Sequence, residues 1–526
     1  MDGWREEANR IKQNYLLKTP FNEFLRSKIL FMETFFIRAL QLILSLSILV
    51  VLHEFGHFFF ARLFKVRVDK FYMFFNPNFS LVRAKRINGR WEVRFLAKNV
   101  PANERPKRDA DGDIIVDAKG RQVVEQIPLH ELPDGDWRKY PETTEWGIGW
   151  LPLGGYCKIA GMIDESMDTS QLNAEPQSWE YRSKPVWQRL PIIIGGVFVN
   201  FILAMVIYAA VLFTWGKEYL PLENAKYGLQ FSKTLIDNGF KNGDNIVAID
   251  GKTIEQTADV IEGILIDSKR NVTVDRNGEK LTIALPSDFA QKVLAAEETS
   301  LISIRYPFVV EEVSDGSPAA DAKLQRGDSV VAINGKSASI YQDVAAELEV
   351  SKNKQIDLSF YRAGQLMHSK VQLSDDGKLG VMMKSPFEFL TTKKIEYGFF
   401  EAIPAGITVG WETLSSYVKQ FKLIFSKEGA KQLGGFGSIG KMFPKVWDWQ
   451  IFWSMTALLS IVLAFMNFLP IPALDGGHVI FLVYEMITKR KPNEKFMEYA
   501  QTAGMLLLFA LLIFANGNDI FKAIFK

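Results

Sequence analysis

The sequence contains very little cysteine and almost no net charge. Cys157 is the single cysteine, so an intrachain disulfide cannot stabilise the fold. The 62 lysines and arginines nearly balance the 60 aspartates and glutamates, which leaves a formal net charge of +2 at pH 7. So small a net charge creates no long-range field, and the sequence carries no nucleic-acid-binding motif. We therefore expect no nucleic acid among the partners.

Residues 1–31 lack the hydrophobic core and the cleavage site of a secretory signal peptide. They predict a polar N-terminal extension. Met32 directly precedes the first hydrophobic run, and a start of translation at Met32 would remove this extension. The basic residues of the extension are Arg5, Arg10, Lys12, Lys18, Arg26 and Lys28.

Long hydrophobic runs are what the chain has in abundance. Hydrophobic residues make up 48% of it, while the 23% of charged residues indicates aqueous parts as well. A helix needs about 20 apolar residues to cross a bilayer. The sequence thus predicts a polytopic α-helical membrane protein with four transmembrane helices, at residues 32–64, 190–215, 451–474 and 499–526.

Basic residues cluster after the first span, before the second, and between the third and the fourth. By the positive-inside rule, residues 65–189 and 475–498 are predicted to be cytoplasmic. Residues 216–450 and both termini then lie outside the cytoplasm. The basic residues of the N-terminal extension count against this orientation, and a start at Met32 would remove the conflict.

The first span contains His53-Glu54-Phe55-Gly56-His57, an HExxH pattern. Residues i and i+4 share one face of a helix, so His53 and His57 can bind one metal ion while Glu54 reaches a water on it. A chance pattern on a core helix is the alternative. Ionisable groups at membrane depth are costly without partners, which favours the functional interpretation.

A metal held by two histidines needs a third protein ligand if one position is to stay open for catalysis. The first and third spans are predicted to run in the same direction, and each carries its polar motif late, so both motifs reach the same membrane depth. Asp475, after the third span, is the favoured third ligand, with His478 as the alternative. Considered alone, Asp475 is also typical of a helix cap and His478 of a buried structural histidine.

Residues 65–189 are heterogeneous. The polar stretch 104–113 predicts a solvated hairpin or a flexible loop. The stretch 146–158 is apolar, rich in glycine and too short to span a membrane, which suits a re-entrant β-element beside the site. Its strand edge could pair with an extended substrate, although an ordinary packed hairpin fits the pattern equally well.

Between the second and third spans the chain repeats itself at an offset of 84 residues. The run from Gly243 to Lys252 returns from Gly327 to Lys336. The two copies predict two α+β domains, 216–298 and 299–385, that resemble PDZ domains. The second copy fits better, because Gly316-Ser317-Pro318-Ala319-Ala320 precedes its predicted short helix and the first copy lacks that segment. Such domains bind peptides in a groove, or these two only shield the membrane site.

Residues 386–450 predict an amphipathic juxtamembrane region. Apolar residues recur there at steps of three and four, as on one face of a helix. This helix is expected at the membrane surface or against the PDZ modules. The residues of the face are Ile407, Trp411, Leu414, Val418, Phe421 and Phe425.

Together these motifs resemble the site-two protease family of intramembrane zinc metalloproteases, in particular its RseP-type members with tandem periplasmic PDZ domains. The resemblance covers nearly everything after Met32. The segments that carry it are 53–57, 66–71, 152–156, Asn200-Phe201 and the motif from Asn467 to Gly476.

The resemblance implies Zn²⁺ as the cofactor and a multi-pass protein of the bacterial inner membrane with periplasmic PDZ domains. It implies transmembrane peptides as substrates, such as anti-sigma factors or remnant signal peptides already trimmed outside the membrane. A catalytically silent PDZ scaffold and a metal transporter are the other hypotheses; Glu54 argues against the first, and the repeat against the second. The implied roles are zinc binding by His53, His57 and Asp475, general base catalysis by Glu54, substrate binding or oxyanion stabilisation by Asn467, and reception of the substrate strand by Gly154, Gly155 and Tyr156.

Overall fold

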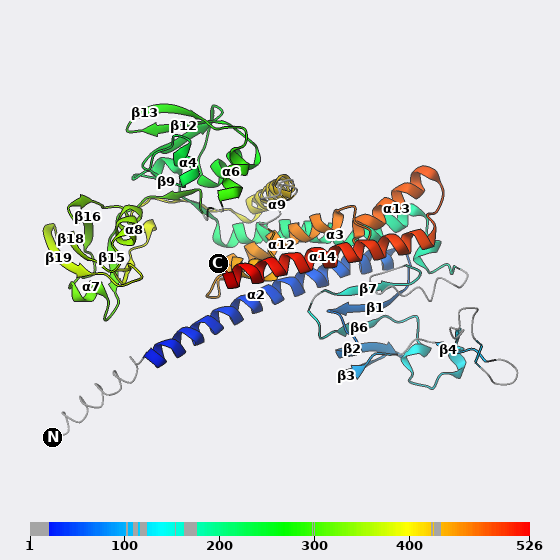
Figure 1. Cartoon of the computed structure of the whole chain (residues 1–526). Helices are drawn as coiled ribbons and strands as arrows, with labels where there is room; N and C mark the ends of the chain where they lie inside the picture. Colours follow the sequence, from blue (N-terminus) through cyan, green and yellow to red (C-terminus); the bar gives the residue numbers. More distant parts are fainter. Residues whose placement is uncertain are drawn as a thin grey trace, which may run out of the picture. The chain divides into compact units, whose positions relative to one another are not determined.

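The computed structural model describes residues 20–100, 104–108, 114–115, 124–152, 154–162, 176–296, 298, 300–421, 424 and 433–525, without the side chains of 20–31, 104, 124, 126, 494 and 525. The chain divides into two compact units (Figure 1). The first comprises Met1–Thr214, Gly398–Tyr417 and Leu433–Lys526, and the second Trp215–Tyr397 and Val418–Gln432.

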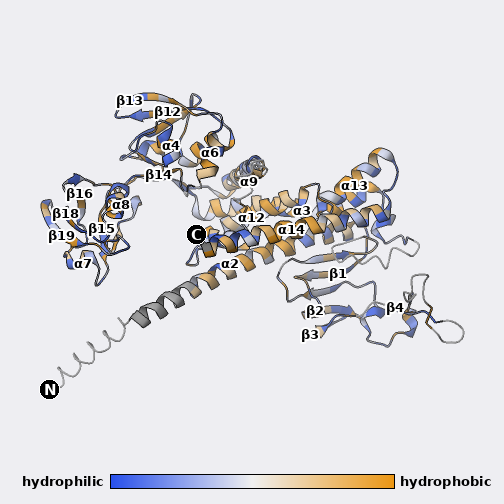
Figure 2. Ribbon diagram, viewed as in Figure 1, coloured by the Kyte–Doolittle hydropathy of each residue, from blue (hydrophilic) through white to orange (hydrophobic). Residues whose placement is uncertain are grey.

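The first unit is built on long helices. Four helices among the described residues are long and apolar enough to cross a membrane, at Met32–Leu63, Val186–Trp215, Trp449–Phe468 and Lys495–Ile524. Figure 2 shows hydrophobic residues along most of their length. The helices that lie wholly or mainly in this unit are α2 (Pro20–Leu63), α3 (Val186–Trp215), α9 (Phe399–Phe421), α11 (Phe436–Met442), α12 (Trp449–Phe468), α13 (Asp475–Thr488) and α14 (Glu494–Phe525).

Helix α2 includes residues 20–31 of the predicted extension, whereas residues 1–19 lie outside the described part of the chain. Near the start of the apolar run, Arg38 Nε donates to the carbonyl oxygen of Phe443 at 3.0 Å. Gln41 Nε2 donates to that of Pro444 at 3.1 Å. These backbone acceptors pair with side-chain donors that would be costly to leave unpaired in hydrocarbon.

Helix α12 ends at Phe468, before the predicted end of the third span at residue 474. Leu469 has an extended backbone, as expected for the residue that precedes Pro470. A short turn then leads into α13, a helix of 14 residues. Sequence reasoning assigned residues 475–498 only to a loop, so α13 is an addition to the predicted architecture.

A five-stranded sheet follows α2 in the sequence and packs against it. The strand order is β3-β2-β6-β1-β7. Strand β1 pairs in parallel with β6 and antiparallel with β7, which lies at the edge of the sheet among the described strands. The strands are β1 (Val68–Met73), β2 (Phe79–Ile87), β3 (Arg90–Lys98), β6 (Glu145–Ile148) and β7 (Tyr156–Ile159).

The polar insert forms a short hairpin in its described part. Strand β4 (Glu104–Pro106) pairs antiparallel with β5 (Val124–Gln126). Residues 109–113 of the predicted hairpin or loop lie outside the described residues, as does Leu153 of the glycine-rich stretch.

The second unit contains two modules of the same design, each with its own hydrophobic core. Their sheets have the orders β11-β10-β12-β13 and β17-β16-β18-β19. The first module comprises β9 (Leu229–Phe231), α4 (Lys233–Asp237), β10 (Asn245–Ile249), β11 (Lys252–Thr253), α5 (Thr257–Ile261), β12 (Asn271–Arg276), β13 (Glu279–Ala284), α6 (Phe289–Ala296) and β14 (Ile302–Ile304). The second comprises β15 (Val310–Val313), α7 (Pro318–Asp321), β16 (Ser329–Ile333), β17 (Lys336–Ser337), α8 (Tyr341–Val350), β18 (Gln355–Arg362), β19 (Gln365–Gln372) and β20 (Val381–Met383).

Each of the two repeats contains an arginine–aspartate ion pair at the corresponding position. Arg276 Nε lies 2.7 Å from Asp244 Oδ1 in the first module, and Arg362 Nη2 lies 2.7 Å from Asp328 Oδ2 in the second. Both aspartates are buried. The same pairing at matching places indicates that the two copies share one architecture.

The first module also has a counterpart of the segment that its sequence lacks. In the second module Ser317 caps α7, and its Oγ accepts a hydrogen bond from the backbone N–H of Ala320. In the first module Ser232 caps α4 and accepts from Leu235. A serine cap needs only the hydroxyl at the right place, so the structural element persists without the Gly-Ser-Pro pattern.

Helix α9 lies where the amphipathic helix was expected, and a face of small residues on it is buried. Ala402, Gly406 and Gly410 are the buried residues. A Cβ on Gly406 would lie 2.4 Å from the backbone nitrogen of Ala209 in α3, so the two helices touch through small residues. Ile407 and Trp411 of the predicted face are 46% and 62% exposed. Phe425 lies outside the described residues.

Candidate metal centre

Two histidines of α2 point at the same place. His53 and His57 are one helical turn apart, and both are buried. Their Nε2 atoms lie 3.2 Å from each other. The HExxH spacing therefore brings two possible metal ligands together as the sequence predicts.

The first residue of α13 completes the group. Asp475 Oδ2 lies 3.3 Å from His53 Nε2 and 3.4 Å from His57 Nε2. Oδ2 is buried and has no hydrogen-bond partner among the residues that the structure describes. A buried carboxylate oxygen without such a partner, facing two imidazole nitrogens, is expected where a cation belongs.

The geometry of this group fits zinc. Zinc binds histidine nitrogen and carboxylate oxygen at about 2.0–2.2 Å with tetrahedral geometry, which requires ligand atoms about 3.3–3.6 Å apart. The three separations between His53, His57 and Asp475, 3.2, 3.3 and 3.4 Å, lie close to this range. Three protein ligands leave the fourth position open, which is typical of a catalytic rather than a structural zinc site.

Helix α3 orients both imidazole rings. His57 Nδ1 lies 2.8 Å from the carbonyl oxygen of Ile192, to which it donates. His53 Nδ1 lies 3.2 Å from the side-chain amide of Asn200. Gly196 of α3 lies so close to the rings that a Cβ there would be 2.5 Å from His57 Nε2.

Glu54 and Asn467 lie beside the two histidines. Glu54 is buried and follows His53 directly on α2. Asn467, near the end of α12, places its Nδ2 3.3 Å from His53 Nε2. The structure thus brings Asn467, the predicted oxyanion or substrate residue, to His53, and it buries the predicted base Glu54 next to His53 in the sequence.

The glycine-rich stretch reaches α2 at Gly155. A Cβ there would lie 2.6 Å from the carbonyl oxygen of Tyr72, 2.8 Å from Val50 Cγ1 and 3.5 Å from Glu54 Cγ. Only glycine therefore fits between strand β1 and the helix that carries the HExxH residues. Gly154 is close to the ring of Phe75, which a Cβ would approach to 2.9 Å.

Tyr156 has a role within the sheet in addition to its predicted contact with substrate. Its ring stacks on Tyr72 with centroids 5.2 Å apart, and its hydroxyl donates to Asn76 Oδ1 at 2.9 Å. The Tyr72 hydroxyl donates to Glu145 Oε1 at 2.6 Å. Burial, together with the Glu145 carboxylate, raises the pKa of Tyr72 above its ordinary value. This network fixes the start of β7 next to the site.

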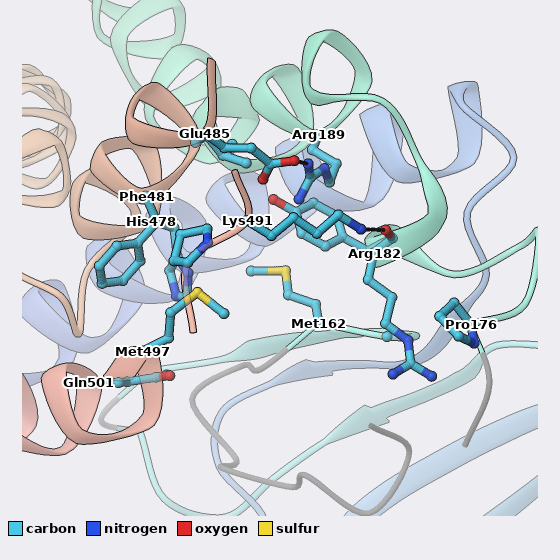
Figure 3. Close-up of a pocket in the computed structure, with 14 residues that line it drawn as sticks. Met162, Pro176, Arg182, Arg189, His478, Phe481, Glu485, Lys491, Met497 and Gln501 are labelled. Carbon is cyan, nitrogen blue, oxygen red and sulfur yellow. Dashed lines mark hydrogen bonds and ion pairs between the residues drawn. The ribbon is translucent and has the colours of Figure 1, made fainter. Parts of the chain in front are cut away.

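His478, the alternative third ligand, does not belong to the close group of His53, His57 and Asp475. It lines a cavity of about 180 Å³ together with residues of α3, α13 and α14 (Figure 3). An ion pair between Arg189 and Glu485, with nitrogen and oxygen 2.5 Å apart, forms part of the wall. The structure therefore favours Asp475 over His478 at the metal centre.

The model of peptidase family M50 matches residues 41–98 and 137–511, which is most of the sequence. The chain belongs to peptidase family M50. The resemblance to the site-two proteases is confirmed, and the protein is a zinc metalloendopeptidase. The donor set of two histidines and one aspartate agrees with this family assignment.

Individual relatives of this M50 peptidase cover nearly its whole length. A Vibrio cholerae protein that carries the provisional name of a zinc metalloprotease is 26% identical over 511 residues, which cover 91% of this chain and 97% of the relative. Protease RseP of Yersinia pestis is 24% identical over 512 residues, with the same coverage. Among solved structures, the PDZ domain of an SdrC-like protein from Listeria monocytogenes is 20% identical and covers 15% of this chain and 90% of that domain, with a TM-score of 0.14.

Sequence reasoning assigned no role to three residues of the site. Asn200 was noted only as part of the family resemblance. No prediction was made for Gly56 of α2 or Gly195 of α3, which lie so close together that a Cβ on Gly56 would be 2.3 Å from the carbonyl oxygen of Gly195. An asparagine and adjacent glycines inside an uncharged span were the available signal, because a polar side chain in hydrocarbon needs a partner and glycines permit close helix contacts.

Proposed function

We propose that this M50 peptidase cleaves single-pass membrane proteins within the bilayer, after their extracytoplasmic part has been trimmed. The observation that carries the proposal is the group of His53, His57 and Asp475 with Glu54 beside it. The two histidines and Glu54 lie on a helix that is long enough to cross a membrane, and Asp475 begins the shorter helix α13. A hydrolytic centre built at that depth acts on peptide bonds that soluble proteases cannot reach.

In this proposal His53, His57 and Asp475 hold the zinc ion. Zinc held there would supply a more acidic bound water and a Lewis acid for the scissile carbonyl. Glu54 accepts the proton of the attacking water and then delivers it to the leaving amine. Asn467 donates from Nδ2 to the substrate carbonyl as negative charge develops on its oxygen.

The substrate is proposed to bind as an added strand at β7. This strand lies at the edge of the described sheet, and Gly155 at its start touches α2 next to Glu54. Strand addition holds a peptide extended through backbone hydrogen bonds. A transmembrane helix hides its carbonyls in intrahelical bonds, so helix-breaking residues in the substrate should promote cleavage.

The orientation proposed from the basic loops places the sheet and α13 on the cytoplasmic side and the second unit outside the cytoplasm. This corresponds to a bacterial inner membrane protein with two periplasmic PDZ domains. The proposed substrates are anti-sigma factors or remnant signal peptides, as the family resemblance implies. The two modules would then contact the outer part of the substrate. They would select substrates either by the size of that part or by its terminal residues.

The test is direct cleavage by purified protein. A panel of single-pass membrane segments, each with a short outer stub, is incubated with the enzyme in proteoliposomes, with and without 1,10-phenanthroline. We expect cleavage within the hydrophobic segment, its loss with the chelator and its return on addition of zinc. Cleavage that persists after complete removal of metal, or that falls only outside the hydrophobic segment, would refute the proposal.

A further inference from the structure

The two histidines of the proposed zinc site are oriented by neighbours of different kinds. The carbonyl oxygen of Ile192, 2.8 Å from His57 Nδ1, can only accept, so Nδ1 carries the proton and Nε2 keeps its lone pair for a metal. At His53 the neighbour of Nδ1 is the side-chain amide of Asn200, at 3.2 Å. An amide offers both a donor and an acceptor, so its orientation decides which tautomer of His53 is stable.

Asn200 is held in place from the other side. It is 0% exposed, and its backbone oxygen accepts a hydrogen bond of 2.7 Å from Ser460 Oγ on α12. Its Oδ1 is buried without a hydrogen-bond partner among the residues described, while Nδ2 faces His53 Nδ1. The amide is fully buried, so a partner for its oxygen must lie inside the protein.

That orientation conflicts with metal binding. If His53 Nε2 gives its lone pair to zinc, the proton of the neutral ring is on Nδ1. Two donors, the Nδ1–H of His53 and the Nδ2–H of Asn200, would then face each other. The oxygen and nitrogen of an asparagine amide have nearly the same shape, so a half-turn of the amide replaces donor by acceptor with no other movement.

We infer that Asn200 is the positioning residue of His53, with Oδ1 turned toward Nδ1 to accept its proton. This orientation gives the buried oxygen its missing partner and fixes the tautomer that leaves Nε2 free for the metal. The inference rests on the proposed zinc site, because the conflict exists only if His53 Nε2 is a ligand. Helix α3 then orients both ligand histidines, one through a backbone carbonyl and one through Asn200.

The experiment compares four variants of the full-length chain in detergent: Asn200→Leu, Asn200→Asp, Asn467→Leu and His53→Ala. The zinc dissociation constant is measured by competition with a chromogenic chelator. Leucine has the same branched arrangement of side-chain heavy atoms as asparagine, although it is larger, and it has no acceptor, so Asn200→Leu should weaken zinc binding about 10- to 100-fold. Aspartate only accepts at either end, so Asn200→Asp should bind zinc nearly as the wild type does.

Asn467→Leu is the matched control, since Asn467 is the same type of residue near the same histidine but faces Nε2, at 3.3 Å. It should retain zinc. His53→Ala separates the two proposals: if it also binds zinc normally, the site itself is wrongly assigned. If His53→Ala loses zinc while Asn200→Leu retains it, only the role of Asn200 is overturned.

The same role is overturned if Asn200→Asp binds zinc as weakly as Asn200→Leu does, since an acceptor would then not be what His53 requires. Thermal unfolding of the metal-free variants shows whether leucine has damaged the fold. If it has, the zinc affinity of Asn200→Asp decides the role of Asn200. Aspartate has the shape of asparagine, so normal zinc binding by this variant would show that an acceptor at this position is sufficient.

Discussion

Gly56 on α2 lies directly against Gly195 on α3: a Cβ added to Gly56 would be 2.3 Å from the carbonyl oxygen of Gly195. The helix backbones are therefore in contact one residue before His57. Small residues permit such contacts between membrane helices, where packing rather than the hydrophobic effect drives association. Because Gly196 follows immediately, the same contact brings α3 against the two histidine rings.

The first prediction concerns Gly196. A Cβ there would lie 2.5 Å from His57 Nε2 and 2.6 Å from His53 Cε1, so Gly196→Ala must displace both rings or separate the helices. We expect weaker zinc binding and a loss of turnover on the order of 10²-fold, the usual result of a displacement of about 1 Å in a catalytic group. Chelator competition and the rate of cleavage measure the two effects.

The control for this substitution is Gly517→Ala on α14, where a Cβ meets no atom within 4 Å among the described residues. It should leave zinc binding and cleavage unchanged. Normal zinc affinity in Gly196→Ala would show that the rings are not confined as described.

The second prediction separates the base from the ligands. Glu54→Gln should retain zinc, because the amide replaces a residue outside the ligand group, and should lose at least about 10²-fold in turnover, because the amide cannot accept the proton of the attacking water. Zinc analysis is paired with the cleavage assay. Glu142→Gln, in an exposed stretch before β6, is the control for loss of a carboxylate. Turnover that survives in Glu54→Gln would exclude Glu54 as the base.

The parts of this site that the sequence predicted are those whose residues are close in the sequence or are fixed by the thickness of a membrane. His53 and His57 are one helical turn apart, so the sequence predicts directly that they share a face of the helix. Asp475 was predicted from membrane depth, a long-range argument that works because a bilayer fixes the length of each span. The close approach of Asp475 to both histidines agrees with that argument.

Other features depend on packing that no single segment encodes. The apolar periodicity of α9 predicted a face with Ile407 and Trp411 at the membrane surface or against the modules, but it did not indicate that the small residues at 402, 406 and 410 would be buried. In a membrane an apolar side chain is stable facing lipid, so hydrophobicity does not distinguish contact face from exposed face. The contact of Asn200 with His53 could not be predicted either, because the two residues are 147 positions apart in the sequence and only helix packing brings them together.

The third prediction decides between the two possible third ligands. Asp475→Ala should lower zinc affinity strongly, because two histidines alone leave zinc short of its usual three protein ligands. His478→Ala should retain zinc, because that ring lines the neighbouring cavity and lies outside the close group. Both variants are measured by the same chelator competition. The reverse pattern would assign the third ligand to His478.

The fourth prediction concerns the glycine-rich stretch. Gly155→Ala would bring a Cβ within 2.6 Å of the carbonyl oxygen of Tyr72, so the start of β7 must move away from α2. Zinc should be retained while cleavage slows, since the metal ligands are not on this strand. Gly440→Ala, where the nearest atom to a Cβ is Leu42 Cδ2 at 3.9 Å, is the matched control. Unchanged cleavage in Gly155→Ala would argue against β7 as the substrate-binding edge.

The last prediction concerns the two modules of the second unit. Strands β8 (Lys217–Tyr219) and β21 (Lys393–Ile395) pair antiparallel, with Tyr219 opposite Lys393, so the two ends of the modules leave side by side. Residues 220–392 can therefore be replaced by an Asn-Gly turn, which suits a two-residue hairpin. If the modules act as a size filter, the shortened enzyme should cleave an untrimmed substrate that the full-length enzyme refuses, and should cleave the trimmed substrate normally. Zinc content must match that of the full-length enzyme for this comparison.

Recognition of chain ends by the modules predicts a different result. A PDZ groove captures a terminus through backbone hydrogen bonds, so removal of the modules would then abolish cleavage of the trimmed substrate, whatever the length of its stub. A series of trimmed substrates that differ only in their last residues provides the control, because a size filter is indifferent to them. If the shortened enzyme still rejects the untrimmed substrate while it cleaves the trimmed one normally, the modules are not the filter, and the refusal must arise in the membrane unit itself.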